Sequence, residues 1–173
     1  VDTYQLGHQF QSTGDHQLKL ISITRTGSAA ATAVTLPQVD FQYTAVPNRL
    51  DTTQYSMLFP RLTKITTETG STVTVGYHSD CSTATKPADP ATNTSMCMPV
   101  KWFPPGNTAP LLDYFNKYVT DSVTAADALA RSPAQLTRYT YVGSVGWRAD
   151  TDSVPAQSRT YGQYRGYAQV NTS

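Results

Sequence analysis

Side chains that alternate with a period of two, in segments that end in tyrosine, constrain this chain most. Segment 61–77 has the pattern of a strand, a tight turn at residues 69–70 and a second strand. Segment 135–143 places Tyr139 and Tyr141 on one face, because successive side chains of a strand point to opposite faces. Such units extend a sheet and do not by themselves assemble a catalytic centre. The pattern therefore favours an architectural role.

Composition agrees with a β-rich protein. The chain has 173 residues, of which 11 are Tyr and 14% are charged, and it is rich in Thr and Val. These residue types fit a pleated, half-buried surface. We predict an all-β fold of antiparallel strands and hairpins, arranged as a curved sheet or a sandwich. The expected strands are 2–10, 18–26, 39–45, 61–67, 72–77, 99–103, 118–125, 135–142 and 159–172.

The connections between these strands contain the usual turn residues. We expect a turn at 12–15 and a small-residue loop at 28–33, with Pro-rich connectors near 46–60 and 81–110. Residues 110–119 have apolar side chains at helical spacing after a proline, so a short helix is expected there, and at most one or two short helices in the chain. No clear boundary divides the sequence, which predicts a single β-rich segment over residues 1–173.

Charge and hydropathy limit the classes of partner. The formal net charge is +1, so no strong field attracts nucleic acid or anionic lipid, and we expect neither nucleic-acid binding nor membrane insertion. No apolar run approaches the roughly 18 residues of a membrane span. The N-terminus lacks the basic and apolar regions of a signal peptide. The low-charge, Thr- and Ser-rich composition is typical of a secreted or cell-surface bacterial protein.

The two cysteines flank a segment rich in Pro, Ser and Thr. Cys81 and Cys97 enclose a 15-residue loop, and its closure by a disulfide would add roughly 3 kcal/mol of stability in the chain-entropy model. We expect this disulfide, with an exposed loop between its ends. The alternative is two reduced and buried thiols. A zinc site is not expected, because two thiols without a nearby His pair fall short of four ligands.

Residues with catalytic or ligand-binding chemistry are scattered. The three histidines, His8, His16 and His78, lack the spacing of a metal site, and Asp150 and Asp152 lack the rest of a calcium loop. No nucleophile elbow or phosphate-binding glycine loop occurs. We therefore expect no catalytic residues, no metal, no cofactor and no enzymatic activity. A carbohydrate-stacking platform is the alternative use of the aromatic side chains, and its candidate residues are Trp102, Trp147, Tyr161 and Tyr164.

Several segments together resemble one known family. Residues 70–78 resemble the tyrosine–aspartate (YD) repeat of bacterial Rhs proteins, although a valine replaces the first tyrosine and a histidine the aspartate. Residues 139–142 match the Tyr-x-Tyr part of the repeat, and residues 163–170 are similar to an Arg-Gly-aromatic strand of the same family. Residues 102–106 and 113–119 resemble the segment that precedes the repeats in large secreted actinobacterial Rhs proteins. Related shells occur in insecticidal toxin-complex proteins.

The resemblance implies a function as well as a fold. Rhs-like proteins form a long β-strip that spirals into a hollow shell around a C-terminal toxic domain. It implies that this chain is a non-catalytic structural segment, whose partners are the remainder of the parent polypeptide and the enclosed toxin domain. The alternative is a secreted β-sandwich module that binds carbohydrate or cell wall. An enzyme is a third and weaker hypothesis.

Overall fold

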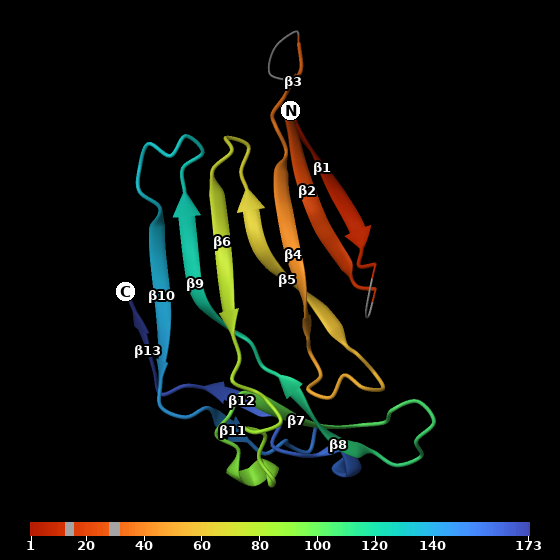
Figure 1. Cartoon of the computed structure of the whole chain (residues 1–173). Helices are drawn as coiled ribbons and strands as arrows, with labels where there is room; N and C mark the ends of the chain where they lie inside the picture. Colours follow the sequence, from red (N-terminus) through yellow and green to blue (C-terminus); the bar gives the residue numbers. More distant parts are fainter. Residues whose placement is uncertain (13–15, 28–31) are drawn as a thin grey trace. The chain divides into compact units, whose positions relative to one another are not determined.

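The structure is a computed structural model of the chain that describes residues 1–12, 16–27 and 32–173 (Figure 1). The expected turn at 12–15 and loop at 28–33 lie largely outside the described residues. The fold is all-β, as predicted: the described residues form one large antiparallel sheet and two separate two-stranded hairpins. The sequence divides into two compact units. Unit 1 comprises residues 1–46, 58–76 and 120–138, and unit 2 comprises residues 47–57, 77–119 and 139–173.

The large sheet contains nine described strands in the order β1-β2-β4-β5-β6-β9-β10-β13, with β3 added beside β2. Most of its strands were predicted to within three residues at either end. The bounds are β1 (Asp2–Phe10), β2 (Leu18–Gly27), β3 (Val34–Thr35), β4 (Val39–Pro47), β5 (Leu58–Thr66), β6 (Thr72–His78), β9 (Val119–Ala126), β10 (Gln135–Val142) and β13 (Gln169–Thr172).

The β5–β6 hairpin forms where the sequence placed it. Lys64 pairs with Thr74 and Ile65 with Val73 across the antiparallel ladder. The turn closes through hydrogen bonds from the Thr67 and Gly70 backbone N–H groups to nearby carbonyls. Gly70 has a φ of +84°, a left-handed conformation that glycine adopts without steric cost. Local turn chemistry and alternation were therefore sufficient to predict this element.

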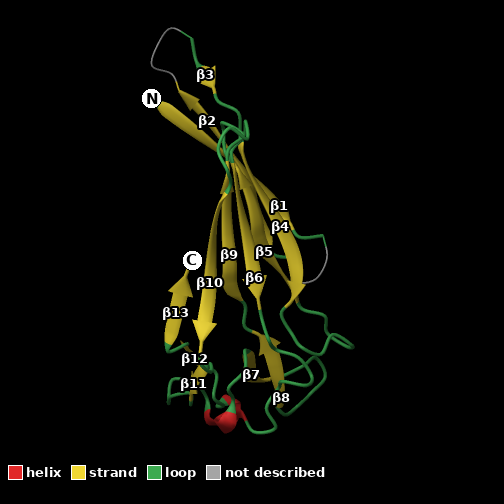
Figure 2. Cartoon of the chain, turned by 60° about the vertical axis from the view of Figure 1, so that its left-hand side comes forward, coloured by secondary structure: helices red, strands yellow, loops and turns green. Residues whose placement is uncertain are grey.

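Unit 1 has little buried interior. Figure 2 shows its strands as a single twisted layer, and the described part of the unit contains no helix. Gln11 is the one buried side chain among its described residues, and it donates through Nε2 to the Leu58 carbonyl. All nine residues of β5 are half-buried, on both faces of the strand. Backbone hydrogen bonds and side-chain contacts within the layer hold this unit together, and its described residues form no two-layer core.

Unit 2 has a compact core. Its hairpins are β7 (Cys97–Trp102) with β8 (Leu111–Asn116), and β11 (Gly146–Arg148) with β12 (Gln163–Gly166). Two short 3-10 turns, η1 (Pro90–Thr92) and η2 (Ala156–Ser158), complete it. The buried side chains of this unit are Arg49, Asn93, Ser95, Met96, Cys97, Pro99, Pro104, Tyr114 and Val145.

The helix expected at 110–119 is wrong, because most of that segment is β8. Met98 pairs with Phe115 and Pro99 with Tyr114 across the β7–β8 ladder. A six-residue strand rich in Leu, Tyr and Phe can satisfy helical spacing by coincidence. Pairing with a buried neighbour then outweighs the weak helical preference of so short a segment.

The long final strand expected at 159–172 is also wrong. Residues 156–158 form a 3-10 turn, and the strand then breaks into β12 and β13. Gly166 has a φ of +82°, which redirects the chain between the two strands. β12 pairs with β11, whereas β13 pairs with the C-terminal half of β10. Gly166, which was expected within a continuous strand, is where the chain changes direction.

Candidate functional site

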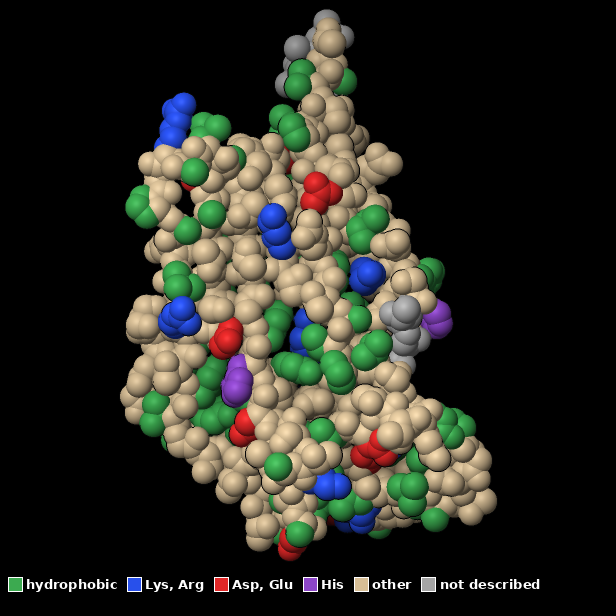
Figure 3. Space-filling model, in the orientation of Figure 1, with side chains coloured by type: hydrophobic (Ala, Val, Ile, Leu, Met, Phe, Trp, Pro, Cys, Tyr) green, Lys and Arg blue, Asp and Glu red, His purple; other side chains and the backbone are tan. Residues whose placement is uncertain are grey.

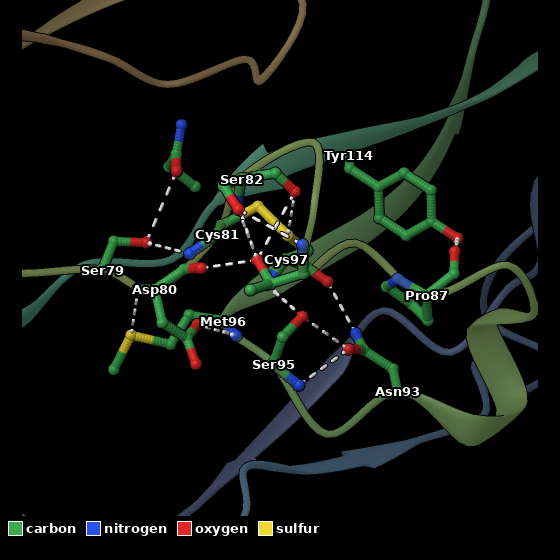
Figure 4. Close-up of a disulfide and its surroundings, with 12 residues drawn as sticks. Ser79, Asp80, Cys81, Ser82, Pro87, Asn93, Ser95, Met96, Cys97 and Tyr114 are labelled. Atoms are coloured by element: carbon green, nitrogen blue, oxygen red, sulfur yellow. Dashed lines mark hydrogen bonds between the residues drawn. A yellow bond between two sulfur atoms is a disulfide. The ribbon is translucent and has the colours of Figure 1, made fainter.

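The predicted disulfide is present in unit 2. Cys81 and Cys97 are bonded, with Cα atoms 4.7 Å apart, and Cys97 is fully buried (Figure 4). Asp80 clamps the same two chain segments together. Its Oδ1 accepts a hydrogen bond from the Met96 N–H at 2.6 Å, and its own N–H lies 3.3 Å from the Met96 sulfur. The covalent bond and the hydrogen bonds therefore join the same two stretches of chain.

The loop between the cysteines is exposed only in part. Thr83 to Lys86 are exposed, as expected, but Asn93, Ser95 and Met96 are buried. Asn93 organises this buried part: its Nδ2 donates to the Cys97 carbonyl at 2.6 Å, and its Oδ1 accepts from the Ser95 N–H and hydroxyl at 3.0 Å (Figure 4). A polar sequence could enter the core because each of these buried polar groups has a partner.

Tyr114 ties the loop to β8. Its hydroxyl donates to the Pro87 carbonyl at 2.8 Å, and the side chain is 7% exposed. Burial raises the pKa of Tyr114, and the negative charge of Asp89 raises it further. The phenol therefore stays neutral at physiological pH and acts as a hydrogen-bond donor, a structural role.

A buried arginine forms a charged cluster with two aspartates in unit 2. Arg49 donates through Nε to Asp113, and its other nitrogens lie 3.5 Å from Asp51 and 3.4 Å from the Tyr55 carbonyl. Trp102 donates through Nε1 to the same Asp113 oxygen at 3.3 Å. The Arg49 side chain is 9% exposed and that of Asp113 is 15% exposed. A buried charge pair of this kind requires these extra hydrogen bonds to offset desolvation.

Aromatic rings enclose this Arg49–Asp113 pair. The Arg49 guanidinium lies 5.5 Å from the Trp102 ring centre and 6.0 Å from that of Tyr55. Trp102 packs edge-on against Tyr55 at 5.9 Å and against Phe115 at 6.3 Å. Backbone hydrogen bonds place residues 48–50 alongside β8, including one from the Leu50 N–H to the Tyr114 carbonyl. The Arg49–Asp113 pair thus fastens the 47–57 connector to the β7–β8 hairpin.

Two neighbouring hollows open beside this pair. One has a volume of about 280 Å³ and the other of about 370 Å³, and both contact Asp51, Lys86 and Asp113. Hydrogen bonds from Thr53 lower the pKa of Asp51, and the positive charges of Arg49 and Lys86 lower it further. The first hollow, here called the Asp51 pocket, is lined by Arg49, Asp51, Gln54, Tyr55, Lys86, Pro104, Pro105, Asn107, Leu111, Leu112 and Asp113.

Trp147 and Tyr164, two of the remaining candidate aromatics, pack against each other. Trp147 donates through Nε1 to the Ser95 carbonyl at 2.9 Å and lies edge-on to Tyr164 at 5.4 Å, with 65° between the rings. Lys117 places its ammonium 4.7 Å from the Tyr164 ring centre. Tyr161 lines a separate shallow hollow. Trp102, Trp147, Tyr161 and Tyr164 are all half-buried, and stacking of sugar on them stays a prediction.

Two of the scattered polar candidates, Asp150 and Asp152, have individual partners. Asp150 accepts from the Thr160 N–H at 2.9 Å, and Asp152 pairs with Arg159 at 2.8 Å. His8 lies in β1 in unit 1, and His78 ends β6 in unit 2. Within the described ranges, no group of three or more His, Cys, Asp or Glu side chains could hold a metal ion. Charged side chains are dispersed over the face of the molecule drawn in Figure 3.

Sequence reasoning missed the Arg49–Asp113 pair. The two residues are 64 positions apart, and neither belongs to a motif. The available signal was weak: an isolated arginine in an otherwise uncharged stretch from 41 to 50, and an aspartate within an apolar-aromatic segment. Burial of such a charge requires a partner, but the sequence does not say which one.

Comparison with family models, with curated proteins and with solved structures found no match for the chain. In the part of the chain that the structure describes, no helix is both long and apolar enough to cross a membrane. The Rhs resemblance therefore rests on the motifs alone.

Proposed function

We propose that this chain is a non-catalytic structural segment of a larger β-shell, of the kind that Rhs-like proteins build around a C-terminal toxin. Its partners would then be the remainder of the parent polypeptide and the enclosed toxin domain, in a secreted or cell-surface bacterial protein. Unit 1 would contribute wall, and unit 2 would act as a rigid, disulfide-fastened block within it.

The half-buried sheet of unit 1 carries this proposal. A soluble single domain usually buries one face of each sheet against a second layer. Here β5 keeps apolar side chains such as Leu62 and Ile65 half-exposed along its length, and the described part of unit 1 has only one buried side chain. A wall segment has this character, because neighbouring parts of the shell cover the faces that an isolated piece leaves open.

The geometry of the tyrosines is consistent with wall packing. Tyr141 of β10 lies 5.0 Å from Tyr167, measured between ring centres, so two of the motif tyrosines pack against each other. Burial raises the pKa of Tyr167 to about 12, with smaller contributions from Asp80 and neighbouring tyrosines. The two rings contribute contact area to the packing.

Assembly with the rest of the gene product tests the proposal. The chain is produced as one polypeptide and the remainder of the gene product as another, and complex formation is measured by co-purification. We expect a stable complex that Ile65→Lys weakens, because the change places a charge on a half-buried sheet face. Leu129→Lys, in an exposed loop of the same unit, serves as the matched control. Failure of the two polypeptides to associate, with each folded, would overturn the proposal.

Carbohydrate binding is the second candidate, and the Asp51 pocket favours it. Sugar hydroxyls both donate and accept hydrogen bonds, and this pocket offers a carboxylate at Asp51, an ammonium at Lys86 and amides at Gln54 and Asn107. Tyr55 supplies an aromatic ring at its wall. These groups differ from the aromatic platform that the sequence suggested.

A glycan panel distinguishes this second candidate. Binding of a cell-wall oligosaccharide that Asp51→Asn and Lys86→Met both weaken, with Asp152→Asn as an exposed control, would support it. Binding unchanged by the two pocket variants, or no binding to any glycan, would reject the pocket as a sugar site.

A further inference from the structure

β1 ends the sheet and has an open edge. The strand is nine residues long, and β2 is its one partner among the strands of the described residues. Alternate backbone N–H and C=O groups along its outer side therefore lack a ladder partner there. Such an edge is a template for another strand. Its length suits pairing, since a typical strand has only about five or six residues.

The side chains of β1 make this edge apolar on one face. Tyr4, Leu6 and Phe10 are 61%, 50% and 66% exposed, and they share a face because the side chains of a strand alternate. Leu18 lies opposite Phe10 on β2 and is 58% exposed. The register shifts between Gly7 and His8 because Ile21 is an extra residue in β2, so the irregularity lies on the neighbouring strand.

The edge also lacks the usual protection against pairing. Natural edge strands often carry Lys, Pro or an inward-pointing charge. β1 has no Lys, Arg or Pro, and its one formal charge at neutral pH is Asp2 at the N-terminal end. Asp2 is neutralised within the chain by Arg25, at 2.6 Å. A second strand can therefore approach from Thr3 to Phe10 without meeting an unpaired charge.

We propose that β1 pairs antiparallel with β1 of a second copy of this chain, about a two-fold axis at Gly7, so that the two sheets become continuous. In this register Tyr4 lies opposite Phe10 of the second copy, Gln5 opposite Gln9, and Leu6 opposite His8. Each of these three pairs occurs twice, and Gly7 meets its own copy on the axis, as a two-fold interface requires. The sequence of β1 is thus complementary to its own reverse: aromatic meets aromatic and amide meets amide.

The alternative two-fold register, centred on Leu6, is less favourable. It places Asp2 opposite Phe10, so a carboxylate that is bonded to Arg25 would face an aromatic ring. It also separates the two aromatic residues, since Tyr4 then meets His8. Registers that pair an odd with an even position are excluded, because paired residues must point to the same face of the sheet.

Dissociation on dilution tests the interface. We expect the wild-type chain to sediment as a dimer and to dissociate over about a hundredfold dilution, as expected for a single strand pair. Leu6→Lys should be monomeric throughout, because it places two ammonium groups close to the axis. Leu129→Lys adds the same charge in an exposed loop and should leave the dimer intact. Circular dichroism checks that both variants keep the β fold.

Engineered cysteines test the register. Both native cysteines are in the disulfide, so an introduced thiol is the only free one. A mixture of Tyr4→Cys and Phe10→Cys should form a cross-linked heterodimer under mild oxidation, whereas Leu6→Cys should not cross-link to itself. Efficient self-cross-linking of Leu6→Cys would overturn the Gly7 register. A wild-type chain that stays monomeric, or a dimer that survives in Leu6→Lys, would overturn the interface itself. Either result leaves the shell proposal to its own test with Ile65→Lys.

Discussion

The two units of this chain are built from the same kinds of residue but are stabilised differently. Unit 1 is a sheet whose side chains are nearly all half-buried or exposed, with Gln11 its one buried side chain in the described ranges. Unit 2 contains the disulfide, fully buried Met96 and Cys97, and a buried charged pair between Arg49 and Asp113. The strands of unit 1 therefore form a layer. The core of unit 2 instead contains a disulfide and buried polar groups that have hydrogen-bond partners.

The difference separates local from long-range stabilisation. In unit 1 truncation of a single side chain should cost little stability, because a half-buried side chain leaves no enclosed cavity when it is removed. In unit 2 the same change empties a packed site or leaves a buried charge without its partner.

Removal of the Asp113 carboxylate should destabilise the chain most. Asp113→Ala leaves the 9%-exposed Arg49 charge without its main partner, and breaking a buried pair in this way costs about 3–5 kcal/mol. Urea denaturation followed by tryptophan fluorescence measures the change. Asp152→Ala removes a carboxylate that is 97% exposed in its pair with Arg159 and should cause no measurable loss. Equal effects of the two variants would contradict the structural role of the Arg49–Asp113 pair.

Truncation of an apolar side chain should cost more in unit 2 than in unit 1. Met96 is 0% exposed, so Met96→Ala should lower the free energy of unfolding by about 2–5 kcal/mol. Ile65 in β5 is half-buried, and Ile65→Ala should cost less than about 2 kcal/mol because it removes less buried surface. The same denaturation experiment compares them. A larger loss for Ile65→Ala would indicate a core in unit 1 that the contrast excludes.

Loss of the disulfide should act mainly on unit 2. The bond joins residues 16 positions apart, and opening such a loop costs about 3 kcal/mol in the chain-entropy model. The Cys81→Ala/Cys97→Ala double variant should therefore lose stability by this amount. Trypsin cleavage mapped by mass spectrometry should increase at Lys101 and Lys117 in unit 2, with Lys64 in unit 1 as the internal control. Increased cleavage confined to Lys64 would contradict the prediction that loss of the disulfide acts mainly on unit 2.

High pH should lower stability least among these changes, and ionisation of Tyr167 should be one cause of the loss. Burial raises the pKa of Tyr167 from 10.0 to about 12. The folded state therefore holds this proton more tightly than the unfolded state, so the contribution is fully present below pH 10 and is lost as the pH rises towards 12. Tyr167→Phe cannot ionise and should show a smaller loss of stability across this window. Identical pH profiles for the two proteins would contradict the burial of the hydroxyl.

Much of the fold could be predicted from local sequence signals. The β5–β6 hairpin follows from alternation around Gly70, and β10 follows from its Tyr-x-Tyr pattern. The Cys81–Cys97 disulfide was predicted from the two cysteines and the loop between them. Each of these features depends on residues that are near one another along the chain, which is why a single sequence was sufficient.

The errors have a common cause in long-range pairing. Residues 110–119 were expected to be a helix because the pairing of β8 with β7 is not visible in the local sequence. Residues 159–172 were expected to be one strand because the change of direction at Gly166 is not visible there either. The burial of Asn93 depends on its bonds to Cys97 and Ser95 within a segment that looks like a polar loop. The Arg49–Asp113 pair brings together residues from two distant segments.

Native-state hydrogen exchange tests the contrast between the two units most directly. Exchange of backbone amides is followed by NMR under conditions in which the chain stays folded. We predict that the slowest amides lie in β7 and β8 of unit 2, and that amides of β5 and β6 up to Gly76 exchange faster through local opening of the uncovered sheet. Reduction of the disulfide should remove most of the difference. Amides of β5 and β6 that exchange as slowly as those of β7 and β8 would contradict this account.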